Sequence, residues 1–208
     1  MNIINTNTSV SNSTNKTDTS IINAVRFEQL SDDVKHEFNL VRGHLGFVPN
    51  LFSYIAHSTS MLYVFFTLSK AFENSSFTPT EREIIQLTTS KVNECNYCLA
   101  GHSYFAKLQG INHSVVVGIL SGTGIENKKL SALYLLCQSM VATRGDVPSA
   151  LLSDFFEQGY SRSQFIDLTM GISLKTFTNL VSKVADIEID ENFNTADLFT
   201  PKGGKSVA

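Results

Sequence analysis

The chain of 208 residues is short of cysteine and of charge, and both shortages narrow what it can be. Three cysteines cannot build the disulfide framework of a small secreted domain, so the sequence favours a cytoplasmic protein. Charged residues make up only 17% of the chain, which is low for a surface that faces water throughout. Part of the surface is therefore expected to be covered by other subunits of a homo-oligomer.

Three further features are missing from the sequence. No apolar run is as long as a membrane span, so no membrane partner is expected. The N-terminus lacks a basic region followed by an apolar run, so no secretory signal is predicted. The net charge is −3 and no basic stripe occurs, which argues against nucleic acid as a partner.

Both ends of the chain read as tails around one domain. Residues 1–22 consist largely of Asn, Ser and Thr, which cannot bury enough apolar surface to offset the entropy of ordering, so a disordered polar tail is predicted. Residues 193–208 are expected to form a second loose tail. The 42% of hydrophobic residues is enough for a core, so residues 23–192 are expected to fold as one helical domain.

The spacing of apolar residues between the tails is helical, and no strand alternation is found. Capping boxes at Thr78 with Glu81 and at Ser161 with Gln164 mark two helix starts, the first with Pro79 at the first helical position. The fold class is therefore all-α, with roughly seven to nine helices. The two longest apolar stripes consist of Leu130, Leu133, Leu136, Cys137, Met140 and Val141, and of Phe165, Leu168, Ile172, Phe177, Leu180, Val181 and Val184.

Residues 93–104, NECNYCLAGHSY, gather chemistry-bearing side chains in one short stretch. In a helix, Cys95, Cys98 and His102 line one stripe, because they are three and four residues apart. The start of a helix favours thiolate, and a histidine one turn further on can accept a thiol proton. Two cysteines three residues apart can also close a disulfide. The stretch therefore describes a reactive thiol with a resolving partner.

A zinc site is the main alternative for these residues, since a single C-x-x-C is often half of one. Zinc needs four ligands, or three with an open position, and no second Cys or His pair follows. Cys137 stands in an apolar stripe and is expected to be a core residue. The residues therefore favour a redox pair over a metal. The remaining histidines are expected to be surface or satisfied residues: His36, His44, His57 and His113.

The segment TPTEREIIQLTTSKVNECNYCLAGHSYFAKLQG, residues 78–110, resembles the core motif of the carboxymuconolactone decarboxylase and alkylhydroperoxidase D superfamily. In that motif a glutamate-containing helix runs into C-x-x-C-x-x-x-H. Residues 46–52, GFVPNLF, resemble its upstream Gly-x-x-Pro-Asn element, and the resemblance spans roughly residues 44–190. It implies an alkylhydroperoxidase D-like helical bundle that assembles as a trimer or hexamer.

The resemblance also assigns roles. It implies a thiol-dependent peroxidase in which Cys98 attacks a hydroperoxide, Cys95 resolves it as a disulfide, and His102 and Glu83 relay protons. Glu83 lies twelve residues before Cys95, as the motif expects. An external dithiol, such as a lipoyl-bearing protein, would reduce the disulfide, and no cofactor or metal is assigned. One position departs from alkylhydroperoxidase D, because Tyr97 stands where that enzyme has a histidine.

Two other functions stay open from the sequence. The first is a lactone decarboxylase of the kind that names the superfamily, whose acid–base chemistry needs no cysteine pair. The second is not an enzyme but a redox-sensing oligomer whose disulfide only reports oxidation.

Overall fold

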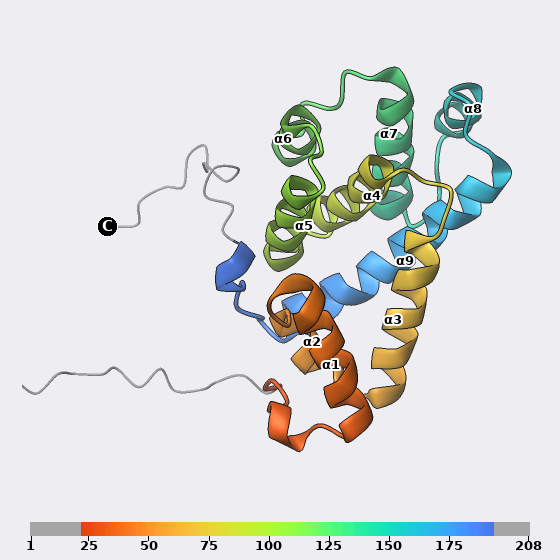
Figure 1. Ribbon diagram of the computed structural model, residues 1–208. Helices are drawn as coiled ribbons and strands as arrows, with labels where there is room; N and C mark the ends of the chain where they lie inside the picture. Colours follow the sequence, from red (N-terminus) through yellow and green to blue (C-terminus); the bar gives the residue numbers. More distant parts are fainter. Residues whose placement is uncertain (1–21, 194–208) are drawn as a thin grey trace, which may run out of the picture.

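The computed structural model describes residues 22–193, and within that range the protein is all-α, as the sequence predicts. Nine α-helices and two short 3-10 helices make up the described part, which contains no strand (Figure 1). The helices are α1 Asp32–Leu45, α2 Asn50–Ile55, α3 Thr59–Glu73, α4 Pro79–Val92, α5 Asn96–Leu108, α6 His113–Ser121, α7 Lys128–Thr143, α8 Ser149–Glu157 and α9 Arg162–Val184, with η1 Phe27–Gln29 and η2 Glu191–Phe193.

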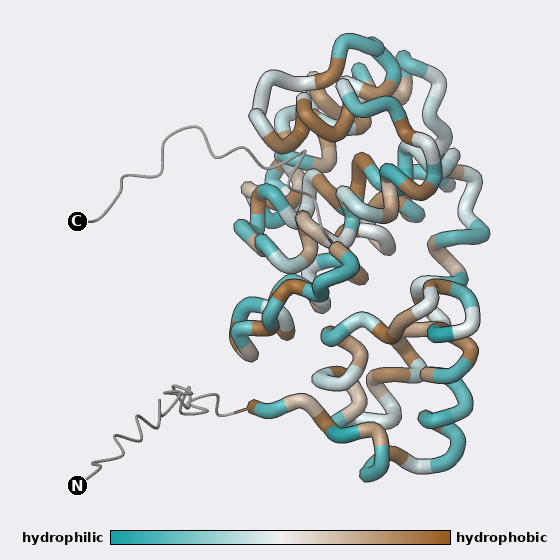
Figure 2. Tube along the Cα trace, turned by 60° about the vertical axis from the view of Figure 1, so that its left-hand side comes forward, coloured by the Kyte–Doolittle hydropathy of each residue, from teal (hydrophilic) through white to brown (hydrophobic). Residues whose placement is uncertain are grey.

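The helices form two groups joined by the longest one. Figure 1 shows α1, α2 and α3 in one group, α4 to α8 in the other, and α9 running between them. Helix α4 lies at the centre of the second group, where it packs against α5, α6, α7 and α9. The hydrophobic stretches, brown in Figure 2, gather mainly inside this second group. Helices α4, α5 and α9 therefore meet where the two groups adjoin.

Two clusters of buried residues form the core, one for each group. The larger cluster includes Leu133, Leu136 and Cys137 of α7, so the first predicted apolar stripe does face inward. The smaller cluster lies among α1, α2, α3 and the start of α5, and it includes both Cys95 and Cys98. The two cysteines of the motif are thus buried at the edge of an apolar core rather than exposed on a helix surface.

The predicted helix starts are confirmed by their hydrogen bonds. The Thr78 backbone N–H donates to the Glu81 carboxylate over 2.8 Å, and the Glu81 N–H donates back to Thr78 Oγ1 over 3.2 Å. Ser161 and Gln164 form the same reciprocal pair at the start of α9. Each pair satisfies two backbone donors that a helix end would otherwise leave free. These caps fix where α4 and α9 begin, and so fix which residues of each face the thiols.

The second predicted apolar stripe is wrong in the last turns of α9. Leu180 is 61% exposed and Val184 is 74% exposed, although both belong to that stripe. The buried face of this part of the helix carries polar residues instead, namely Lys175, Thr178, Asn179 and Ser182. The reason is that this face lies against the cysteine motif and the turn before it, where polar partners are available.

The predicted tails fall almost wholly outside the described residues. Two residues are exceptions. Ile22, of the first tail, is exposed, whereas Phe193, of the second, is buried and makes edge-to-face ring contacts with Phe47, Tyr97 and Phe105. The domain therefore extends at least to this residue. Between residues 22 and 193, no helix combines the length and the apolar character needed to cross a membrane.

Candidate active site

The cysteine motif begins at a tight turn between α4 and α5. Glu94 adopts a left-handed conformation with φ 53°, and the Cys95 N–H donates to the Ser90 carbonyl over 2.9 Å. This is the geometry that usually ends a helix at a glycine. Cys95 then caps α5, because its Sγ accepts a hydrogen bond from the Cys98 N–H at 3.4 Å. Asn93 and Glu94 therefore belong to the turn, and Cys95 is the N-cap of α5.

Cys98 lies in the first turn of α5 and faces α9. Its Sγ is 3.6 Å from the hydroxyl of Ser182. The pKa of the Cys98 thiol is well below its ordinary value, chiefly because the Cys95 side chain hydrogen-bonds to it. The nearby Lys175 charge and hydrogen bonds from Ser182 and Asn179 lower the pKa further, against the opposing effect of burial. Cys98 is therefore the thiol of the pair that ionises first.

Cys95 behaves in the opposite way. The hydrogen bond with Cys98 raises the pKa of the Cys95 thiol, and burial raises it further. Both cysteines are free thiols in the structure. The pair thus holds one proton on Cys95, which donates toward the Cys98 sulfur. Such an unequal pair suits one attacking and one resolving thiol.

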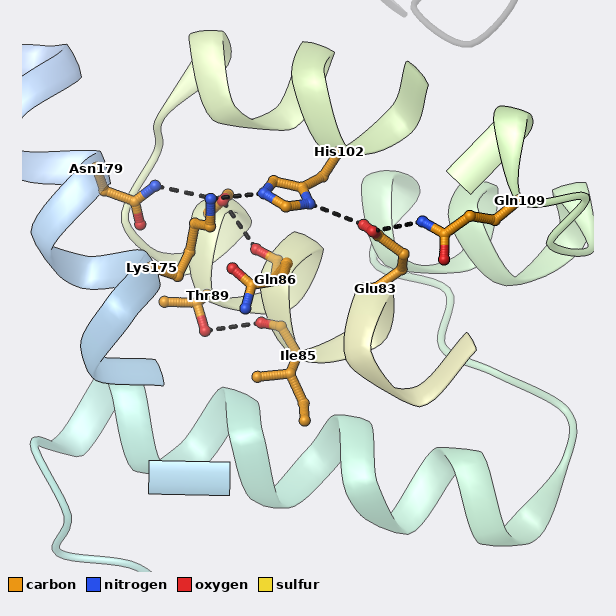
Figure 3. A network of polar contacts seen from close by, with 9 residues as sticks. Glu83, Ile85, Gln86, Thr89, His102, Gln109, Lys175 and Asn179 are labelled. Carbon is orange, nitrogen blue, oxygen red and sulfur yellow. Dashed lines mark hydrogen bonds and ion pairs between the residues drawn. The ribbon is translucent and has the colours of Figure 1, made fainter. Parts of the chain in front are cut away.

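Glu83, His102 and Lys175 form a chain of polar contacts across three helices (Figure 3). His102 Nδ1 lies 2.8 Å from Glu83 Oε2, and the other Glu83 oxygen accepts a hydrogen bond from Gln109 over 3.0 Å. His102 Nε2 lies 2.5 Å from Lys175 Nζ. An ammonium can only donate, so Nε2 is the acceptor and the proton of the neutral imidazole sits on Nδ1, toward Glu83. The contact between Glu83 and His102 that the motif suggested is therefore present.

The series of polar contacts ends at Lys175, and this changes the role expected for His102. Both ring nitrogens of His102 have partners other than Cys98, so the imidazole is not placed to accept the thiol proton directly. Lys175 of α9 is only 6% exposed and supplies the positive charge that acts on Cys98. Lys175 was not predicted as a site residue, because a single lysine in a helix is usually solvated.

A cavity of about 510 Å³ opens onto these residues. Cys98, His102, Glu83 and Lys175 all line it, whereas Cys95 does not. The rest of its wall is largely apolar, with contributions from Phe52, Phe65, Phe72, Phe105, Leu108, Leu174 and Phe193. A small organic molecule in this cavity would therefore meet the Cys98 sulfur, and not the Cys95 sulfur.

Tyr97, which stands between the two cysteines, is held by two hydrogen bonds. Its hydroxyl donates to the Asp190 carboxylate over 2.7 Å and accepts from the Leu51 N–H over 3.1 Å. The same carboxylate accepts the Asn50 N–H at the start of α2. Tyr97 therefore ties the cysteine helix to α2 and to the segment before η2. Its hydroxyl is already occupied by these contacts, which favours a structural role.

The geometry does not favour zinc. In the part of the chain that the structure describes, no group of three or more His, Cys, Asp and Glu side chains is arranged to hold a metal ion. His102 also has an ammonium group at Nε2 and a carboxylate at Nδ1, so neither nitrogen is turned toward the thiols as a ligand.

Comparison with known proteins agrees with this architecture. Residues 63–120, which include α4, the turn and both thiols, match the Carboxymuconolactone decarboxylase family. An uncharacterized peroxidase-related protein from Silicibacter sp. TM1040 superposes with a TM-score of 0.77 at 16% identity, over 88% of this chain and 98% of that one. A second one, an alkylhydroperoxidase AhpD core protein from Ralstonia eutropha JMP134, gives 0.74 at 22% identity, over 84% and 94%. Residues 63–120 therefore resemble this family, and the chain shares the overall fold of these two solved structures.

The same fold also occurs in a protein with a different activity, a debrominase. The debrominase Bmp8 superposes with a TM-score of 0.72 at 16% identity, over 83% of this chain and 94% of that one. A cysteine-to-alanine variant of Bmp8 has been solved in complex with 2,3,4-tribromopyrrole. Comparison with curated protein sequences gives no match. These solved structures share the fold of this chain, and a fold does not by itself specify a reaction, so the function has to be argued from the site.

Proposed function

We propose that this protein is a thiol-dependent peroxidase that reduces organic hydroperoxides through Cys98 and Cys95. One observation carries the proposal: the thiol that lines the cavity, Cys98, is also the one whose pKa is lowered. The thiolate is the nucleophilic form, so the reactive sulfur and the space for a substrate coincide. The neighbouring Cys95 keeps its proton and lies outside the cavity wall, as a resolving thiol would.

The reaction would run in three balanced steps. The Cys98 thiolate attacks the terminal oxygen of the hydroperoxide, so that an S–O bond forms, the O–O bond breaks and an alkoxide leaves. The Cys95 thiol then condenses with the Cys98 sulfenic acid, which releases water and leaves a disulfide. An external dithiol reduces this disulfide by exchange and is itself oxidised.

The polar chain would supply the proton that the alkoxide needs. Lys175 lines the cavity together with Cys98, and its ammonium is a proton donor there. The amine can regain a proton from His102 once the ring has taken up a proton at Nε2, because Glu83 at Nδ1 stabilises the resulting imidazolium. The residues that the motif assigned to a relay thus act, in this proposal, through Lys175 rather than directly on the sulfur.

Other parts of the proposal come from the superfamily resemblance alone. These are the lipoyl-bearing or other dithiol reductant and the assembly as a trimer or hexamer. The two rival functions differ from it in what they require. A lactone decarboxylase would not need the two thiols, and a redox sensor would be oxidised once without turnover.

Single cysteine variants test the proposal. With cumene hydroperoxide and dithiothreitol, we expect Cys98→Ser to lose all peroxidase turnover. Without dithiothreitol, Cys95→Ser should react once with the hydroperoxide and accumulate a sulfenic acid on Cys98 that dimedone traps. Cys137→Ser serves as the control that removes a thiol without touching the pair.

Three results would contradict the proposal in different ways. Full activity in Cys98→Ser would exclude this thiol as the nucleophile. A decarboxylase activity retained in the double variant of Cys95 and Cys98 would favour the lactone enzyme. Oxidation of the wild-type pair without turnover, with any dithiol, would favour the sensor.

A further inference from the structure

The cavity contains one polar side chain whose hydrogen-bonding groups are not used by the described part of the protein. Gln86 of α4 is 4% exposed, and neither its Oε1 nor its Nε2 has a hydrogen-bond partner there. The same side chain lines the cavity together with Cys98 and Lys175. A buried amide without partners is costly, because it gives up its hydrogen bonds to water. Both amide atoms are themselves buried, so rotation of this flexible side chain toward the cavity is what would bring them to a ligand with a donor and an acceptor.

The position of Gln86 on α4 distinguishes it from other buried polar groups. Glu83 and Ser90 lie on the same face of the helix, one turn before and one turn after it, and both are engaged: Glu83 by His102, and Ser90 as donor to the Gln86 carbonyl. In Figure 3 the Gln86 amide lies in the region between Lys175 and Glu83. Thr88 and Ser103 also have buried hydroxyls without described partners, but neither lines the cavity.

We propose that Gln86 binds the hydroperoxide group of the substrate, an inference that rests on the peroxidase function proposed above. A hydroperoxide has one O–H donor and two acceptor oxygens, which matches a primary amide. Gln86 Oε1 accepts the terminal O–H, and Gln86 Nε2 donates to the inner oxygen. The terminal oxygen is thereby turned toward Cys98 Sγ.

This placement makes Gln86 a catalytic residue and not only a binding one. When Cys98 attacks, the sulfur gives an electron pair to the terminal oxygen and is oxidised. The O–O pair stays on the inner oxygen, which becomes an alkoxide and takes a proton from Lys175. The Nε2–H bond to that oxygen strengthens as the negative charge develops, and an interaction that grows in the transition state raises the rate.

The test compares two variants on the same helix. Gln86→Met keeps the length of the side chain and removes its polar atoms, while Thr88→Val removes an unpartnered buried hydroxyl away from the cavity. We expect Gln86→Met to lose about tenfold in kcat/KM for cumene hydroperoxide, with dithiothreitol as reductant. Thr88→Val should keep the wild-type value. If Gln86→Met does not fold, the smaller Gln86→Leu takes its place.

Two further readouts separate a role in the reaction from a structural one. Alkylation of Cys98 by iodoacetamide needs the thiolate but no hydroperoxide, so its rate should not change in Gln86→Met. The unfolding temperature should stay the same or rise, because an unpartnered amide is removed from the interior. A residue that only supported the fold would give the opposite result, a lower unfolding temperature.

The outcomes that overturn the inference are distinct from failure of the proposed function. A Gln86→Met protein with wild-type kcat/KM, in the presence of an active wild type, overturns the role of Gln86 alone. A loss matched by equally slow alkylation would mean that Gln86 acts on the thiol rather than on the substrate, which also overturns it. A wild type that alkylates readily but consumes no hydroperoxide overturns the peroxidase function and this inference together.

Discussion

Cys98 and Cys137 lie on opposite sides of α4 and are both buried, yet their surroundings give them opposite chemistry. Cys98 is 3% exposed and Cys137 is fully buried. Cys137 has only Thr89 Oγ1 and the Ile85 carbonyl as weak partners, and burial raises its pKa to about 12. Cys98 has a thiol donor, two further polar donors and a lysine, and its pKa is lowered.

The difference shows that partners, and not exposure, decide which cysteine of this protein is reactive. Burial disfavours the thiolate at both positions, since it removes water from the charge. At Cys98, donors and a cation outweigh this effect, while at Cys137 nothing does. Each of the following substitutions either removes a group that acts on Cys98 or the polar contacts beside it, or tests a group that should not affect the reactivity of Cys98.

The largest effect is expected from His102→Gln. Glutamine keeps a polar side chain but cannot pass a proton between Glu83 and Lys175, so kcat for cumene hydroperoxide should fall by about a hundredfold. The rate of Cys98 alkylation should change little, because Lys175 keeps its charge. His113→Gln, on α6, is the matched control. A parallel collapse of alkylation would show that His102 acts on the thiol directly.

A smaller but more specific effect is expected from Lys175→Met, which removes the cation and keeps the length of the chain. The pKa of Cys98 should rise by roughly one unit or more. At a pH below the wild-type midpoint, where both proteins are mostly protonated at Cys98, alkylation should therefore slow by about tenfold, and it should recover as the pH is raised. The exposed Arg162→Met, at the far end of the same helix, should leave the profile unchanged. An unchanged pH profile in Lys175→Met would remove the lysine from the explanation.

Tyr97→Phe tests the scaffold around the thiols. The buried Leu51 N–H and the Asp190 carboxylate each lose a hydrogen bond, so we expect the free energy of unfolding to fall by about 1–3 kcal/mol. Denaturant unfolding measures this, with Tyr104→Phe as the control. The alkylation profile of Cys98 should stay acid-shifted. If the alkylation profile of Cys98 lost its acid shift while the free energy of unfolding stayed at the wild-type value, the Tyr97 hydroxyl would instead have a role in the chemistry.

The smallest effect is expected at Cys137, the unreactive cysteine of the comparison. Cys137→Ala removes a sulfur from a packed interior, which should cost about 1 kcal/mol of stability. Peroxidase turnover should be unchanged, because Cys137 does not line the cavity. Loss of turnover without loss of stability would mean that the two sides of α4 are coupled.

Local signals in the sequence were enough to predict the fold class and the part of the site that lies on α4 and α5. The capping boxes and helical periodicity act within a few residues, so the starts of α4 and α9 followed from them. The resemblance placed Glu83 in the motif, and the structure puts it in contact with His102. The cap of α5 was missed because cysteine is an unusual capping residue.

The part of the site that lies on α9 depends on contacts between residues far apart in the sequence, which no local pattern contains. Lys175 reaches His102 from 73 residues away in the chain, and Ser182 reaches Cys98 from 84. One signal was available: Lys175, Asn179 and Ser182 recur at helical spacing, as a polar face of α9. That face looks like a solvated one until the packing of α9 against α5 shows that it is buried. Gln86 was not predicted for the same reason, because only the packing around α4 shows that it is buried.

The central claim is that Cys98, and neither of the other cysteines, is a thiolate near neutral pH. Its most direct test is the pH dependence of iodoacetamide alkylation, resolved by residue with peptide mass spectrometry. The claim predicts that Cys98 reacts with a midpoint well below the free-cysteine value of about 8.5, while Cys95 and Cys137 react only above it. A Cys98 midpoint at or above that value would contradict the claim.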